Sequence, residues 1–237
     1  MYPAADLLAV KKPVLITDQL AAPADFLVFR TVTTHLKENK QNRCIVLSTF
    51  NDVPRWKAIA SKSALNVDQL IAAGLLKFVD ILFHVQPGAS TLRPLLDLVQ
   101  TFANDTSATT SHLLVVFDAI STLEWLGFNT TEPGRLSRAL SSFCRKSSAS
   151  LLLRYHILDR EVIDDTFSLL QQLAAYRVEV RPLSSGKSGA VSGEICIHLG
   201  PLHDETLTTI EPDKTFQYRL TDFSATFFTK GTGATVL

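Results

Sequence analysis

The chain has 237 residues, of which 46% are hydrophobic and 19% are charged. This length is enough to bury a substantial core, and the composition excludes a disordered or fibrous protein. Lys and Arg together number 23, as do Asp and Glu, so the formal net charge is zero. That balance argues against general attraction to nucleic acid or anionic membranes, leaves room for local basic patches, and suits a subunit that associates without charge repulsion.

The cysteines and the N-terminal segment indicate the compartment. Cys44, Cys144 and Cys196 are odd in number and far apart, which is not a disulfide framework and favours a reducing environment. The N-terminal segment has no long apolar stretch, and no segment of the chain has transmembrane length. We therefore expect no signal peptide, no membrane partner, and a location in the cytosol or the nucleus.

Along the first three quarters of the chain, short apolar runs alternate with amphipathic stretches of helical period. The run Leu113 to Phe117 is the most continuous and predicts a central strand. Pro54 and Pro133 stand where proline is favoured in the first turn of a helix, and Asp159 is a plausible N-cap. We predict strands at 14–16, 44–47, 78–83, 113–117 and 151–153, and helices at 24–38, from 54, at 91–103, at 123–127, from 133 and from 159.

From residue 176 onward the apolar residues alternate with polar ones at a period of two, which is typical of half-exposed strands. Strands are predicted there at 176–180, 195–199, 216–220 and 224–229. The whole pattern predicts one α/β domain over residues 1–237, with a mainly parallel central sheet, helices on both faces and an antiparallel C-terminal extension. Trp56 and Trp125 are expected to pack in the interior.

The turn after the first predicted strand lacks the parts of a phosphate-binding loop. Such a loop uses glycines for close backbone approach, free N–H donors, a Lys, and a Ser or Thr for the metal. Residues 17–25 contain neither Gly nor Lys, and Pro23 removes one donor. Asp18 and Asp25 would each repel a bound polyphosphate by on the order of 1 kcal/mol. We predict that this turn does not bind ATP phosphates and that the chain carries no cofactor.

The Gly-Lys-Ser stretch at residues 186–188 stands in the wrong context for phosphate binding. The motif needs a Gly at position 181, which is Arg181 here, and a helix after the loop. Because the segment leads into a predicted strand, we expect a hairpin loop. Its Lys187 is a candidate contact for RNA or for a neighbouring subunit.

Asp118 ends the predicted central strand, where a nucleotide hydrolase would hold its metal-orienting acid. Without a phosphate-binding loop, we interpret Asp118 as a strand-end residue that caps the following turn. The alternative, an acid of an atypical nucleotide site, would make the chain a RecA-type ATPase or a recombination-linked protein.

Other catalytic and metal-binding patterns are weak. No Gly-x-Ser-x-Gly or dinucleotide-binding motif is present, so no catalytic residue is predicted. Cys196 and His198 share a strand face, but Gly200-Pro201 separates them from His203 and Asp204, and we predict no metal site. Arg135, Arg138 and Arg145 lie on the outer side of a predicted helix, either as a solvated face or as an RNA or subunit contact.

Two stretches carry a family resemblance. Residues 113–127, Leu-Leu-Val-Val-Phe-Asp-Ala-Ile-Ser-Thr-Leu-Glu-Trp-Leu-Gly, resemble the degenerate second nucleotide motif of Elongator complex protein 6. The C-terminal segment, from Phe216 through Phe227-Phe228-Thr229-Lys230-Gly231 to Leu237, is similar to that family's ending. The strand pattern between them fits as well, so the resemblance covers nearly the whole chain.

The resemblance implies a RecA-like fold without working nucleotide motifs. It also implies a hetero-hexameric ring with the fourth and fifth Elongator subunits, which binds tRNA and assists the catalytic Elongator subcomplex in modifying the wobble uridine. No catalytic residue is carried over. The C-terminal strands, with Phe223, Phe227 and Phe228 on both faces, are the predicted subunit contact. A regulatory pseudo-ATPase of an unrelated assembly remains a further alternative.

Overall fold

The computed structural model describes residues 11–49, 52–62, 65–86, 88–105, 112–158, 164–183, 186, 188–203, 215–221 and 224–229. Its strands are β1 (Val14–Asp18), β2 (Arg43–Ser48), β3 (Leu76–Asp80), β4 (Leu113–Asp118), β5 (Ser150–His156), β6 (Tyr176–Arg181), β7 (Gly193–Leu199), β8 (Thr215–Leu220) and β9 (Ala225–Thr229). They form one sheet in the order β3-β2-β4-β5-β1-β6-β7-β8-β9. Pairing is parallel from β3 to β6 and antiparallel from β6 to β9.

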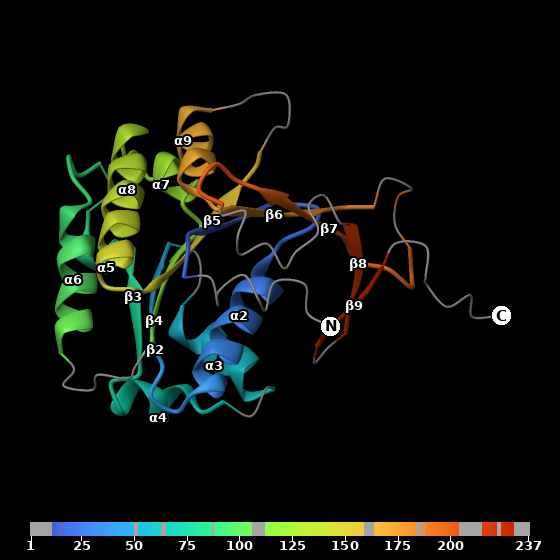
Figure 1. The fold of residues 1–237 in the computed structure, drawn as a ribbon, viewed down its shortest axis with the longest axis horizontal. Coiled ribbons are helices and arrows are strands. Elements are labelled where there is room, and N and C mark those ends of the chain that lie inside the picture. The colour runs from blue at the N-terminus through green and yellow to red at the C-terminus, as the bar shows by residue number, and fades with distance from the viewer. Residues whose placement is uncertain are drawn as a thin grey trace.

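Helices cover both faces of the parallel part of this sheet (Figure 1). One face is covered by α2 (Asp25–Glu38), α3 (Val53–Ser61) and α4 (Val67–Ala72). The other is covered by α5 (Ile81–His84), α6 (Arg93–Asn104), α7 (Thr122–Trp125), α8 (Thr131–Lys146) and α9 (Asp165–Leu173). The predicted α/β architecture, with its mainly parallel sheet and antiparallel extension, is confirmed.

The central strands are apolar throughout because both of their faces are covered. In β4, Leu114 and Val116 pack on the α2 side, whereas Val115 and Phe117 pack on the α8 side. This alternation follows from the period of two in a strand, and all four side chains are completely buried. In β6 the alternation becomes one of buried and half-buried residues, since helices cover that part of the sheet less fully.

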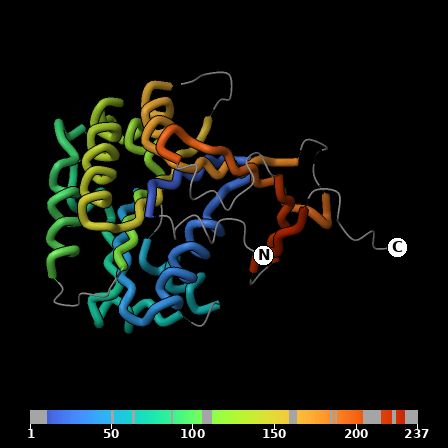
Figure 2. The backbone as a smooth tube through the Cα atoms, in the orientation of Figure 1, coloured from blue at the N-terminus to red at the C-terminus, as the bar shows by residue number. Residues whose placement is uncertain are grey.

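The C-terminal strands bend toward the side of α2 (Figure 2). The rings of Phe26 and Tyr218 lie 4.7 Å apart between their centroids. Arg30 of α2 donates a hydrogen bond of 2.7 Å to the carbonyl oxygen of Ala225, and its guanidinium lies 5.0 Å from the centroid of the Phe227 ring. The antiparallel extension is therefore packed against the parallel domain body through aromatic and cation–π contacts.

Three predictions about individual elements were wrong. The predicted strand at 78–83 ends at Asp80, because the Asp80 carboxylate accepts a hydrogen bond from the Leu82 N–H and starts the short helix α5. Helix α9 begins at Asp165 with Asp164 as its N-cap; Asp159 itself lies outside the described residues. Trp56 is buried as expected, but the Trp125 side chain is 66% exposed.

A histidine pair lies at the amino ends of the parallel strands. His35 Nε2 lies 3.1 Å from the carbonyl oxygens of both Arg43 and His112, and the two imidazole rings are 5.3 Å apart. Burial lowers the pKa of His35. Burial, together with the charges of His35 and Lys11, lowers the pKa of His112 to about 4. Both histidines are therefore neutral in the folded protein at physiological pH.

The lowered pKa values of His35 and His112 make the free energy of unfolding depend on pH. An unfolded histidine binds its proton near pH 6.5, whereas folded His112 does so only near pH 4. The pair's contribution to the free energy of unfolding is thus complete above about pH 6.5 and is lost as the pH falls toward 4. We expect H112Q to flatten the pH dependence of urea unfolding in this window. The exposed control H84Q should keep the wild-type dependence, and equal slopes for H112Q and wild type would contradict the prediction.

Candidate functional site

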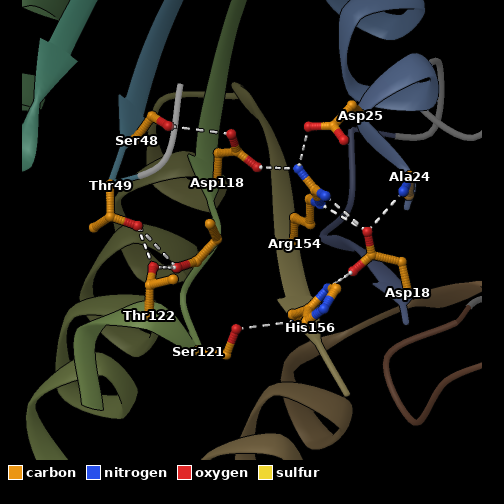
Figure 3. Close-up of polar contacts among 11 residues, drawn as sticks. Asp18, Ala24, Asp25, Ser48, Thr49, Asp118, Ser121, Thr122, Arg154 and His156 are labelled. Atoms are coloured by element: carbon orange, nitrogen blue, oxygen red, sulfur yellow. Dashed lines mark hydrogen bonds and ion pairs between the residues drawn. The ribbon is translucent and has the colours of Figure 1, made fainter. Parts of the chain in front are cut away.

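The carboxyl ends of β4, β5 and β1 bring a cluster of charged side chains together (Figure 3). β5 lies between the other two strands, and its Arg154 is the centre of the cluster. Asp18 ends β1, Asp118 ends β4, and Asp25 begins α2. In open parallel sheets this edge is where ligands bind, so its chemistry decides what the domain does.

Arg154 binds all three carboxylates. Its Nη2 lies 2.7 Å and its Nε 3.2 Å from Asp18 Oδ2, so the guanidinium fork donates two hydrogen bonds to one oxygen. Its Nη1 lies 3.0 Å from Asp25 Oδ1 and 3.1 Å from Asp118 Oδ1. The Arg154 side chain is only 5% exposed, and those of Asp18 and Asp118 are fully buried. One guanidinium therefore ties two strand ends and a helix start to β5.

The charges in the cluster stabilise one another's ionised forms. Burial lowers the pKa of Arg154, but the charges of Asp118, Asp18 and Asp25 outweigh it and raise that pKa above its usual value. Burial raises the pKa of Asp18, but the hydrogen bond from His156 and the positive charge of Arg154 bring that pKa below its usual value. His156 Nδ1 lies 2.8 Å from Asp18 Oδ1. Asp18 and Arg154 therefore stay ionised at neutral pH.

Asp18 also occupies the start of α2, where a phosphate-binding loop would hold its ligand. The backbone N–H of Ala24 donates a hydrogen bond of 2.6 Å to Asp18 Oδ2. Helix N-termini attract anions because their first N–H groups have no partner within the helix. Here the anion is a carboxylate of the same chain. A polyphosphate would have to displace it and would then face Asp25 and Asp118 as well.

The structure gives Asp118 a different environment from the predicted turn cap. Besides Arg154, its carboxylate accepts a hydrogen bond of 3.2 Å from Ser48 Oγ at the end of β2. The next residue, Ala119, has a positive φ of 56°, which is unusual for a residue other than glycine. The hydroxyl of Thr49 donates to the Ala119 carbonyl at 3.1 Å, and the Thr122 hydroxyl contacts the same carbonyl. Asp118 is thus part of a buried network that fixes the β2 and β4 ends.

Arg154 and His156 are not among the residues predicted from the sequence, because the apolar run at 151–153 accounts for a buried strand on its own. A signal was present, since the charged Arg154 directly follows that run. A charged residue in a buried strand needs partners, and the acids that end the neighbouring strands are the natural ones.

The other candidate residues lie away from this cluster or outside the described part of the chain. Lys187 and Phe223 are not described, although β6 and β7 pair antiparallel as the hairpin prediction required. Phe227 packs near Phe26, and Phe228 is half-buried. No cluster of metal ligands is present among the described residues. Cys196 Sγ lies 2.9 Å from Thr215 Oγ1, and His198 Nε2 lies 3.0 Å from Glu179 Oε2.

Comparison with known proteins identifies the family. Residues 7–191 match the model of the family described as Elongator subunit Iki1. The chain belongs to this Elongator subunit family. The predicted resemblance to Elongator is thereby confirmed at the level of the subunit family. No curated protein matches the chain in sequence.

This Elongator subunit has a RecA-like fold. It superposes on the crystal structure of a KaiC-like protein from the hyperthermophilic archaeon Pyrococcus horikoshii with a TM-score of 0.64. The match covers 92% of this chain and 89% of the other at 8% sequence identity, so it concerns the fold alone. In the described part of the chain, no helix is both long enough and apolar enough to cross a bilayer.

The ion cluster around Arg154 allows a prediction about the free energy of unfolding. Replacing Arg154 by Met keeps much of the side-chain volume but leaves Asp18 and Asp118 buried without their counter-ion. We expect R154M to lower the free energy of unfolding by about 3–5 kcal/mol, as is typical when one partner of a buried ion pair is removed. Urea denaturation followed by circular dichroism would measure this loss. The control R93M removes an exposed pair with Asp97 and should cost about 1 kcal/mol or less.

A double variant separates loss of charge pairing from loss of packing. If the cost of R154M comes from the unpaired carboxylates, D18N/R154M should be more stable than the sum of the two single changes predicts. Additive effects, or a loss of under about 1 kcal/mol for R154M, would mean that the cluster is not held together by charge.

Proposed function

We propose that the chain is the sixth subunit of Elongator and acts as a non-catalytic member of a hetero-hexameric RecA-like ring. The ring would form with the fourth and fifth subunits, bind tRNA, and support the formation of 5-methoxycarbonylmethyl and 5-carbamoylmethyl uridine at the wobble position by the catalytic subcomplex. The family match supports an Elongator subunit. The choice of the sixth subunit rests on the resemblance of residues 113–127 and of residues 216–237, and the second of these stretches lies beyond the matched range.

The filled carboxyl edge supports an accessory role rather than an ATPase. The position of the phosphates is taken by the Asp18 carboxylate, and the strand-end acid Asp118 binds Arg154. Neither group is then available for nucleotide chemistry in the arrangement described above. We therefore propose that residues 1–237 act as one domain without a working phosphate-binding loop.

The observation that carries the ring proposal is a group of exposed apolar side chains at this same edge. They come from four separate connections that follow β1, β3, β4 and β5, and we call them the apolar rim: Leu20 (87% exposed), Phe83 (87%), Trp125 (66%) and Leu158 (64%). Large apolar side chains that are exposed along one edge of a sheet are candidates for a protein–protein contact. We propose that a neighbouring ring subunit, and not a nucleotide, covers this edge.

We expect substitutions in the apolar rim to weaken assembly of the ring. Co-expression of F83S/W125S with the fourth and fifth subunits should reduce recovery of the chain in the ring at least about tenfold, because each aromatic anchor contributes on the order of 1 kcal/mol or more. Quantitative mass spectrometry of the affinity-purified ring measures this. Since both side chains are exposed in the isolated chain, its own thermal unfolding should change little.

L202S is a matched control, because Leu202 is 43% exposed but follows β7, outside the apolar rim. It should assemble like wild type. If F83S/W125S assembles normally while F228S does not, the interface lies on the C-terminal strands, where Phe223, Phe227 and Phe228 were predicted to form it. A wild-type chain that recovers neither partner subunit would reject the proposed function. The predicted tRNA contact at Lys187 is tested separately by K187E in the assembled ring.

A further inference from the structure

Although the chain has no net charge, acidic residues gather at the starts of its helices and basic residues at the ends of two of them. Helices in a parallel α/β unit start near the carboxyl ends of the strands and end near the amino ends. Three helix starts are capped by carboxylates, those of Asp52, Asp80 and Asp164. By contrast, the last turns of α2 and α8 carry basic residues, as the helix dipole favours. The amino edge of the sheet therefore collects positive charge.

The strand order arranges these basic residues in a row. From β3 through β2, β4 and β5 to β1, each amino end is preceded by, or contains, Lys or Arg, with the exception of β4, which is preceded by His112. We call this row the basic edge: Lys77 in β3, Lys37 and Lys40 before β2, Arg145 and Lys146 before β5, and Lys11 and Lys12 before β1. Five neighbouring strands span about 19 Å at the usual spacing. Among the described residues, the acids in the turns before these strands are Glu38, which precedes β2, and Asp105, which precedes β4.

Observations within the chain place Lys40 beside Lys77 and place Lys11 near His112. Lys40 and Lys77 line one cavity of about 670 Å³, together with Arg43 and Asp105. Arg43 is anchored at this place, since its Nη2 donates a hydrogen bond of 2.7 Å to the carbonyl oxygen of Phe102. At the other end, the positive charge of Lys11 acts on His112. Most of the row is solvent-exposed, with Lys12 and Lys77 half-buried.

We infer that the basic edge binds the phosphate backbone of a folded RNA. The inference rests on the proposed function, which makes that RNA a tRNA, and it names the surface that the tRNA contacts. Flexible lysines spaced along a row suit successive phosphates, whose contacts position a nucleic acid without reading its sequence. A protein partner is less well matched to this edge, because the most exposed apolar side chains lie at the opposite edge, in the apolar rim.

The test uses the chain assembled with the Elongator subunits that co-purify with it, and an in vitro transcribed tRNA as the probe. K40Q/K77Q/K146Q removes three charges from separate places on the basic edge. We expect tRNA binding at about 0.1 M salt to weaken at least tenfold, and the slope of log affinity against log salt to become shallower by about two to three, at roughly 0.7–0.9 per lost phosphate contact.

The control R55Q/K57Q/R93Q removes the same number of charges from exposed positions on α3 and α6, outside the basic edge. It should keep both the affinity and the salt slope. Unchanged tRNA binding by K40Q/K77Q/K146Q, or an equal loss in the control, would overturn the inference. Loss of the partner subunits from K40Q/K77Q/K146Q would also overturn it, since the edge would then be a protein interface. A wild-type chain that recovers no Elongator subunit would instead reject the proposed function, and tRNA binding by the isolated chain would still decide the role of the basic edge.

Discussion

The buried guanidinium of Arg154 is the interaction on which the architecture of this edge depends. It contacts all three of Asp18, Asp25 and Asp118, and it reaches them from the strand between β1 and β4. Three carboxylates at the ends of adjacent elements would repel one another strongly at low dielectric. With Arg154 between them, the same charges become a fixed connection between β1, β4, β5 and α2. Burying such a cluster costs desolvation energy, so it specifies geometry more than it adds stability.

The same cluster changes what the RecA-like fold can do. In a nucleotide-binding relative of this layout, the start of the first helix would offer its N–H groups to phosphate. Here the Asp18 carboxylate accepts the Ala24 N–H, so an anion of the same chain already lies at the start of this helix. The edge is left with apolar side chains at its rim, suited to a protein neighbour. The basic edge lies at the opposite ends of the strands, and there we infer the RNA contact.

Much of the fold was predictable because its signals are local. The run at Leu113–Phe117 is apolar at every position, and this indicated a strand covered on both faces, as β4 is. The absence of Gly and Lys from residues 17–25 likewise led to the prediction that the first turn is not a phosphate-binding loop, and in the structure the Asp18 carboxylate accepts the Ala24 N–H of this turn. Capping was harder to predict: Asp80 converts an apolar run into the end of β3 and the start of α5, and the pattern of hydrophobic residues carries no sign of it.

The site was only half predictable, since its key contacts join residues far apart in the sequence. Asp18 and Asp118 drew attention as strand-end acids, but their shared partner Arg154 is 136 and 36 residues away, respectively. Which strand lies between β1 and β4 is a property of the sheet order, and only that order makes Arg154 the common partner. Trp125 was expected inside because tryptophan is usually buried, yet it follows the central strand at the open edge, where a partner chain can cover it.

A crystal structure of the chain grown with millimolar Mg·ATP is the decisive experiment. We expect electron density in which Asp18 still accepts the Ala24 N–H, Arg154 still bridges the carboxylates, and no phosphate lies in the first turn. Density for β- and γ-phosphates hydrogen-bonded to the amides of residues 19–25, with the Asp18 side chain displaced, would contradict it.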